Sequence, residues 1–204
     1  MKKLLSVILI ICSIAAYSQN VDTVITNPIL KSYFCREYKQ PLYVAYYMYH
    51  GGGDASRGGM SFKSVKKLTA KAGDYAHSGY DEGHLASAED FADYDSTLRY
   101  TFYFYNCVPQ TPNLNRGIWK IWENTVRLES QKDSVYVICG GYNYKLVNKL
   151  YVPQNCFKIV KNMKTKKLTH VLIFTNGDPS TCVETNLSTL IKKTKYTKLK
   201  TLLK

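Results

Sequence analysis

Apolar and aromatic residues gather into short runs that predict strands. Residues 42–50 (LYVAYYMYH) are rich in aromatic and branched side chains and end at three consecutive glycines. Runs of this kind, bounded by glycine or polar residues, are typical of strands. Residues 134–139 form such a run, which the pair Gly140-Gly141 would close. Strands are therefore predicted at residues 42–50, 98–105, 134–139, 156–160 and 170–175.

A different spacing predicts helices. Within residues 113–129, Ile118, Trp119, Trp122 and Val126 share one helical face. Residues 51–80 are rich in glycine and small polar residues and predict a long loop, and residues 185–204 predict a basic helix. This order of elements indicates an α+β fold with a central antiparallel sheet and flanking helices.

The first 18 residues have the three-part pattern of a signal peptide. Lys2 and Lys3 precede a short apolar run, and Ala16 and Ser18 are the small residues before a cut at Gln19. We expect residues 1–18 to be removed on export and residues 19–204 to form one domain, secreted or periplasmic. The chain has no second apolar span, so no stable membrane association is expected.

Export also affects the cysteines. Five of the six cysteines follow the apolar run, and an oxidising compartment predicts one or two disulfides among them. The pairing and the oligomeric state do not follow from the sequence.

The charge is strongly positive: 28 Lys and Arg stand against 15 Asp and Glu, a net charge of +13. Such a balance favours polyanionic partners, which include nucleic acids, acidic polysaccharides and anionic membranes. Many of the lysines crowd into the last quarter of the chain, where a solvated basic tail explains them equally well. Charge alone does not choose between these readings.

Two segments carry candidate chemistry. Residues 78–86 (SGYDEGHLA) place His84 at the end of the glycine-rich loop, where an imidazole can be exposed and exchange protons near neutral pH. Such a histidine can also be an ordinary loop residue, and one histidine does not decide between the two.

The second segment is residues 105–119 (YNCVPQTPNLNRGIW), which continues to Glu123. Asn115 lies at the start of the predicted helix, where it is either a helix N-cap or an oxygen ligand for a hard cation. Glu123 lies about two turns further on. It could hold a water of that cation, or it could be a surface carboxylate.

Together the two segments resemble the DNA/RNA non-specific endonuclease family, which includes secreted bacterial nucleases and mitochondrial endonuclease G. The family has an Asp-Arg-Gly-His motif, and then an Asn-x-x-Pro-Gln stretch that leads to a metal-binding Asn and a helical Glu. The likeness extends over residues 57–185. The matching residues are Asp81, Gly83, His84, Asn106, Pro109, Gln110, Asn115, Trp119 and Glu123.

This resemblance implies a ββα-metal fold, in which two strands and a helix bring the base and the metal ligand together. It implies that His84 is the general base and that Asn115 binds Mg²⁺, with Mn²⁺ as a possible substitute. Glu123 would hold a water of the cation, and Asn106 would support the site. The expected activity is hydrolysis of DNA and RNA without regard to base sequence.

One residue departs from the family pattern. Glu82 stands where the family has arginine, which exchanges a phosphate-binding cation for an anion. Arg57 could compensate if it matches a family arginine that precedes the first motif, although it could also be a plain surface residue. Arg116, beside the metal ligand, is the other candidate.

Three alternatives stay open. Glu82 favours a nucleic-acid-binding protein of the same fold with weak or no catalysis. Cys107 and His84 could form a cysteine hydrolase, and the positive charge is also compatible with a surface adhesin.

Overall fold

The computed structural model describes residues 20–204, so the predicted signal peptide lies outside the described residues. Its centre is a seven-stranded sheet in which every neighbouring pair is antiparallel, in the order β1-β2-β3-β6-β7-β8-β9. The strands are β1 Thr23–Thr26, β2 Leu30–Cys35, β3 Gln40–Met48, β6 Val135–Val147, β7 Leu150–Asn162, β8 Leu168–Thr175 and β9 Cys182–Glu184.

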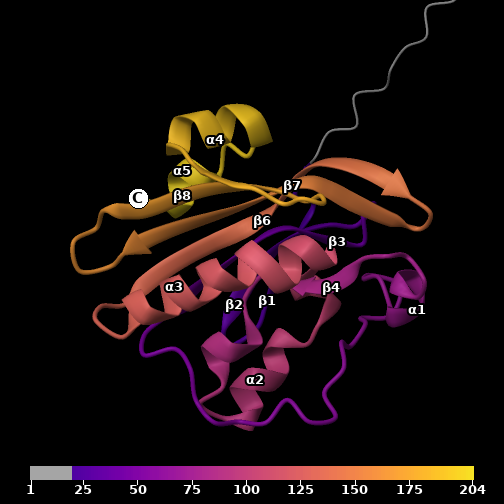
Figure 1. Cartoon of the computed structure of the whole chain (residues 1–204), viewed down its shortest axis with the longest axis horizontal. Coiled ribbons are helices and arrows are strands. Elements are labelled where there is room, and N and C mark those ends of the chain that lie inside the picture. The colour runs from indigo at the N-terminus through magenta and orange to yellow at the C-terminus, as the bar shows by residue number, and fades with distance from the viewer. Residues whose placement is uncertain (1–19) are drawn as a thin grey trace, which may run out of the picture.

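A separate two-stranded sheet and several helices complete the fold (Figure 1). The small strands are β4 Asp81–His84 and β5 Cys107–Gln110. The helices are α1 Ala72–Tyr75, α2 Asp95–Thr101, α3 Lys120–Ser130, α4 Leu187–Thr194 and α5 Leu199–Leu202, with short turns η1 Ala88–Phe91, η2 Phe104–Asn106 and η3 Leu114–Trp119. The predicted α+β class with an antiparallel sheet and flanking helices is confirmed.

The large sheet is covered on both faces. Because side chains alternate along a strand, Val135 and Val137 of β6 face one core, and Tyr136 and Ile138 face the other. The first core packs beneath α3 and the small sheet, and the second packs beneath α4 and α5 (Figure 1). The small sheet and α3 therefore lie together on one face.

The predicted strand at residues 98–105 is wrong. This segment forms the end of α2 followed by η2. Leu98, Thr101 and Phe104 are buried at intervals of three residues, which is a helical spacing. The aromatic residues of this run suggested a strand, but packing against a core decides the outcome more than β-propensity does.

The glycines at 140 and 141 do not close a strand as predicted. They lie inside β6, which continues to Val147. A Cβ added to Gly140 would lie 2.1 Å from the carbonyl oxygen of Leu42 and 2.6 Å from the Cα of Tyr43. Glycine is therefore required here because β3 and β6 approach too closely for a side chain.

The C-terminal segment forms two helices instead of one. Helix α4 ends at Thr194 and is followed by Lys195, whose φ of 63° is left-handed, and α5 begins at Leu199. Leu190, Ile191 and Leu199 are buried in the second core. The basic tail is thus an amphipathic cover for the sheet, with its lysines mostly on the outside.

The expectation of disulfides is not met, because all five cysteines of residues 20–204 are free. Cys139 and Cys156 are fully buried and pack as small apolar side chains in the first core. Among the described residues, no helix has the length and apolar character needed to cross a membrane.

The close approach at Gly140 gives a test of the sheet. Gly140→Ala should destabilise the protein by about 1–3 kcal/mol, because the new methyl group meets backbone that cannot move aside. Gly73→Ala on α1 is the matched control, since a Cβ there meets nothing within 4 Å and alanine favours helix. Thermal unfolding measures both variants. Equal melting temperatures would show that β3 and β6 are not packed as described.

Candidate active site

The end of β4 is held in place by β5 and the residues around it. The two strands are antiparallel, with Asp81 opposite Gln110 and His84 opposite Cys107. A Cβ on Gly83 would lie 2.2 Å from the side-chain oxygen of Gln110, which is fully buried. Glycine at this position lets the strands come together directly before His84.

Asn106 fixes the chain that follows His84. Its side-chain oxygen accepts from the N–H of Ala86 at 2.8 Å, and its amide donates to the carbonyls of Ala86 at 2.8 Å and Thr101 at 2.9 Å. Its backbone carbonyl also accepts from Leu85 N–H at 2.9 Å. Asn106 is fully buried, so it positions the site from behind and does not face solvent.

Trp119 attaches the helix to the same strand. Its indole N–H donates to the carbonyl oxygen of His84 at 3.2 Å. The ring packs edge-on against Phe174 of β8, with centroids 5.0 Å apart, and the ammonium of Lys158 lies 4.2 Å from its centroid. Both Trp119 and Lys158 are almost completely buried. This one side chain sets the distance between His84 and the helix.

The helix begins irregularly. Residues Leu114–Trp119 form a π-helical turn, in which Gly117 departs from helical geometry with φ −102° and ψ −115°, and α3 follows directly. Such turns are frequent at functional sites because they redirect side chains. The predicted helix at residues 113–129 is confirmed, with this irregular first part.

His84 is partly buried between aromatic rings. Its ring centroid lies 4.5 Å from that of Phe62 and 4.9 Å from that of Phe102, and its Nε2 is buried without a hydrogen-bond partner. Burial, assisted by the positive charge of Arg57, lowers the pKa of His84 to about 3. The imidazole is therefore partly buried and not exposed as expected, and the lowered pKa favours its neutral form.

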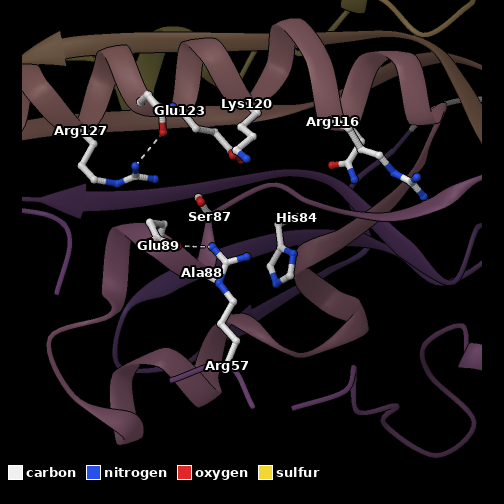
Figure 2. Close-up of a pocket in the computed structure, with 11 residues that line it drawn as sticks. Arg57, His84, Ser87, Ala88, Glu89, Arg116, Lys120, Glu123 and Arg127 are labelled. Carbon is white, nitrogen blue, oxygen red and sulfur yellow. Dashed lines mark hydrogen bonds and ion pairs between the residues drawn. The ribbon is translucent and has the colours of Figure 1, made fainter. Parts of the chain in front are cut away.

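A pocket of about 500 Å³ opens between His84 and the helix. Figure 2 shows Arg116, Lys120, Glu123 and Arg127 along the helical wall, and Arg57, His84, Ser87 and Glu89 on the opposite wall. Asn115 lines the same pocket. Of the predicted residues, His84, Glu123, Arg57, Asn115 and Arg116 thus share one pocket.

The amide of Asn115 has a fixed orientation. Its Nδ2 donates to Asp81 Oδ2 at 2.9 Å, so its carbonyl oxygen is the atom that can act as a ligand. Arg116 holds Asp81 with two hydrogen bonds of 2.6 and 2.8 Å. Burial raises the pKa of Asp81, but these hydrogen bonds more than offset it and leave the pKa below its usual value. Asn115 does not cap the helix.

Glu123 lies near the charged groups Lys158, Asp90 and Arg127. Burial raises its pKa to about 7, and the positive charge of Lys158 opposes the rise. Beside it, Arg127 donates from Nε to buried Asp90 at 3.0 Å, and Tyr46 donates to the same carboxylate at 3.2 Å. A buried carboxylate with these partners keeps Arg127 in position at the pocket.

Arg57 and Glu82 differ in their access to the pocket. Arg57 lines it and forms an ion pair with Glu89 (Figure 2). Each of the two side chains is about half exposed, 51% and 47%. Glu82 does not line the pocket, and its charge acts instead on Tyr75 and Cys107. Burial raises the pKa of Glu82.

The cysteine hydrolase does not fit this geometry. Although Cys107 pairs with His84 in the sheet register, its side chain is fully buried and its thiol contacts the hydroxyl of Tyr75 at 3.4 Å. Burial raises the pKa of Cys107 far above the range of a reactive thiolate.

Sequence reasoning missed four charged residues: Lys120, Arg127 and Glu89, which line the pocket, and Asp90, which holds Arg127 from behind. The two on the helix had a usable signal, since Arg127 follows Glu123 by four residues and Lys120 follows Arg116 by four, which places each pair on one helical face. Glu89 and Asp90 belong to η1, for which the sequence offers no comparable periodicity.

The donors in the pocket suit a hard cation. Within residues 20–204 no group of three or more His, Cys, Asp and Glu side chains forms a metal-binding cluster. The oriented amide oxygen of Asn115 is a single hard ligand, and the carboxylates of Glu89 and Glu123 line the same pocket. One protein oxygen with several waters is how Mg²⁺ is often held beside phosphate.

Comparison with curated proteins finds several nucleases. A protein named Nuclease from Nostoc sp. (strain PCC 7120) is 37% identical to this chain over 90 residues. These residues cover 42% of this chain and 33% of the relative. Mitochondrial Nuclease EXOG of Danio rerio is 32% identical over 132 residues, 55% of this chain and 38% of the relative. Mitochondrial Endonuclease G of Homo sapiens is 34% identical over 93 residues, 43% of this chain and 31% of the relative. The matches span about a third of the length of these relatives.

Among solved structures, a chain in the crystal structure of the EndoG/EndoGI complex has the same fold. Its TM-score is 0.71 at 22% sequence identity, covering 83% of this chain and 82% of that chain. The family model for DNA/RNA non-specific endonuclease matches residues 12–202. The resemblance predicted from the two motifs is thereby confirmed, and the chain belongs to the DNA/RNA non-specific endonuclease family.

Proposed function

We propose that this chain is a metal-dependent endonuclease that hydrolyses phosphodiester bonds in DNA and RNA without sequence preference. In this proposal His84 is the general base and Asn115 is the protein ligand of Mg²⁺, for which Mn²⁺ can substitute. The observation that carries it is that the imidazole of His84, the oriented amide oxygen of Asn115, two carboxylates and four cations line one pocket.

His84 has the properties of a base in this role. A low pKa keeps its imidazole free of a proton at neutral pH, so it can accept one from the attacking water. Phe62 and Phe102 hold its ring, Trp119 holds its backbone carbonyl, and Asn106 holds the backbone of Ala86, two residues on. The side chain therefore does not need to reorganise before the proton moves.

Asn115 and Glu123 would hold the cation and one of its waters, while Arg57 and Arg127 bind the phosphate oxygens. When bound, Mg²⁺ would stabilise the negative charge that develops on the phosphate and on the leaving oxygen. In this proposal all these groups contact the phosphate, directly or through the cation, and the phosphate is the same in every nucleotide. Contacts of this kind position a substrate without reading its bases.

The location of Glu82 supports catalysis over binding alone. The alternative of an inactive binding protein rested on repulsion between this carboxylate and phosphate. Glu82 does not line the pocket, so its charge does not stand directly against the substrate. We also infer from the sequence that residues 1–18 are a signal peptide and that residues 19–204 act as one exported nuclease domain.

His84→Ala should lower cleavage of a supercoiled plasmid by at least about a hundredfold, because the attacking water loses its base. The fold should persist, since His84 packs at the edge of the core. Plasmid nicking with Mg²⁺ and with a chelator measures the activity, and circular dichroism checks the fold. Near-normal cleavage by the folded variant would reject His84 as the base.

Asn115→Ala should raise the Mg²⁺ concentration needed for half-maximal cleavage by at least about tenfold, because the protein ligand is lost. Asn155→Ala, on β7 outside the pocket, is the matched control and should behave as wild type. The shift in melting temperature on adding Mn²⁺ gives a second readout that does not need cleavage. An unchanged Mg²⁺ requirement would remove Asn115 from the cation site.

The pKa values also predict the pH dependence. With a pKa of about 7, Glu123 takes up a proton as the pH falls through 7, so cleavage should fall with it, whereas His84 stays neutral until about pH 3. Glu123→Gln should be slower but should lack this acid limb. A pH–rate profile of both proteins measures it. If the cleavage rate of Glu123→Gln still decreases as the pH falls through 7, a group other than Glu123 causes the decrease.

A further inference from the structure

Four cations line the pocket, and three of them are already paired with carboxylates. Arg57 pairs with Glu89, and Arg116 is held by Asp81 through two hydrogen bonds. Arg127 pairs with Asp90, with a separation of 3.0 Å, and also donates to the side chain of Asn124 at 2.8 Å. Each of these arginines shares its positive charge with a protein carboxylate before any phosphate arrives.

Lys120 is different. It is exposed, it lines the same pocket, and it makes no ion pair or hydrogen bond through its side chain with any residue of the described range 20–204. Figure 2 shows its side chain directed from the helix toward the wall that carries His84 and Ser87. An ammonium without a counter-ion can bind phosphate without first leaving a carboxylate, so more of its charge is available to the substrate.

Lys120 also lies where it can supply the positive charge that is missing at position 82. Where the family motif has an arginine beside the base, this chain has Glu82, which does not line the pocket. The strand wall therefore lacks one cation. Lys120 is the first residue of α3, four residues after Arg116 and three before Glu123, and lines the facing wall of the same pocket.

We propose that Lys120 binds a phosphate of the cleaved strand in addition to Arg57 and Arg127, and takes the place of the arginine that Glu82 has replaced. Its ammonium donates hydrogen bonds to non-bridging phosphate oxygens and holds the strand against the helical wall. Arg57 and Arg116, the two candidates for this substitution in the sequence, are each paired with a carboxylate, Glu89 and Asp81 respectively. This inference rests on the proposed nuclease function.

Lys120→Gln tests it in cleavage. The variant should raise KM for duplex DNA by about tenfold, as expected for the loss of one charge-assisted hydrogen bond, and should leave kcat within about twofold. Lys120→Arg should restore most of the affinity. Lys132→Gln, which removes the same charge just beyond α3 and outside the pocket, is the matched control and should keep the wild-type KM.

Binding provides a readout that does not depend on cleavage. In a His84→Ala background, fluorescence anisotropy of a labelled oligonucleotide should show about tenfold weaker binding when Lys120→Gln is added. The slope of log affinity against log salt concentration should fall by about one unit, as for the loss of one phosphate contact. Lys132→Gln in the same background should change neither.

The two proposals fail in distinguishable ways. If the wild-type protein does not cleave nucleic acid with Mg²⁺, the nuclease function fails, while the binding measurement still tests Lys120. If cleavage requires His84 but Lys120→Gln and Lys132→Gln have equal KM, equal affinity and equal salt slopes, the role of Lys120 is overturned. A loss confined to kcat, with unchanged binding, also overturns it.

Discussion

The site depends on the indole of Trp119, which connects three parts of the chain. Its N–H donates to the carbonyl of His84, its ring packs on Phe174 of the large sheet, and Lys158 lies over its face. The whole side chain is buried, so its position is set by the core rather than by solvent. The strand that carries the base and the helix that carries the ligands are therefore held at a fixed separation, and all the proposed chemistry occurs in the gap between them.

A second constraint is the balance of charge around that gap. Buried or partly buried ions need partners, and the fold supplies them as Asp81 with Arg116 and Asp90 with Arg127. These pairs orient Asn115 and hold Arg127 beside Glu123. The burial of His84 lowers its pKa and so favours the neutral imidazole. Preorganised groups of this kind act on a developing charge without the cost of turning toward it during the reaction.

The sequence predicts the parts of this structure that depend on local pattern and motif. The runs at residues 42–50, 156–160 and 170–175 form strands, and the spacing of Trp119, Trp122 and Val126 predicts α3. The two motifs predict that His84, Asn115 and Glu123 meet, and all three line one pocket.

What the sequence does not predict depends on contacts between distant residues. The segment at 98–105 is helical because Leu98 and Thr101 face a core supplied by the rest of the chain. The low pKa of His84 requires Phe62 and Phe102 around it. The pairing of Glu89 with Arg57 joins η1 to a loop residue 32 positions away in the sequence, and the absence of Glu82 from the pocket depends on how β4 packs. Only the first of these facts has a periodic pattern in the sequence, and the aromatic residues around Leu98 and Thr101 obscure it.

The most direct test of the account is the place of the cation. A crystal structure of the His84→Ala protein with Mn²⁺ and a short oligonucleotide would locate the ion by its anomalous scattering. The account predicts one peak in the pocket, bound by the side-chain oxygen of Asn115 and by a phosphate oxygen, on the side that faces position 84. A peak bound elsewhere, with Asn115 still directed only at Asp81, would contradict it.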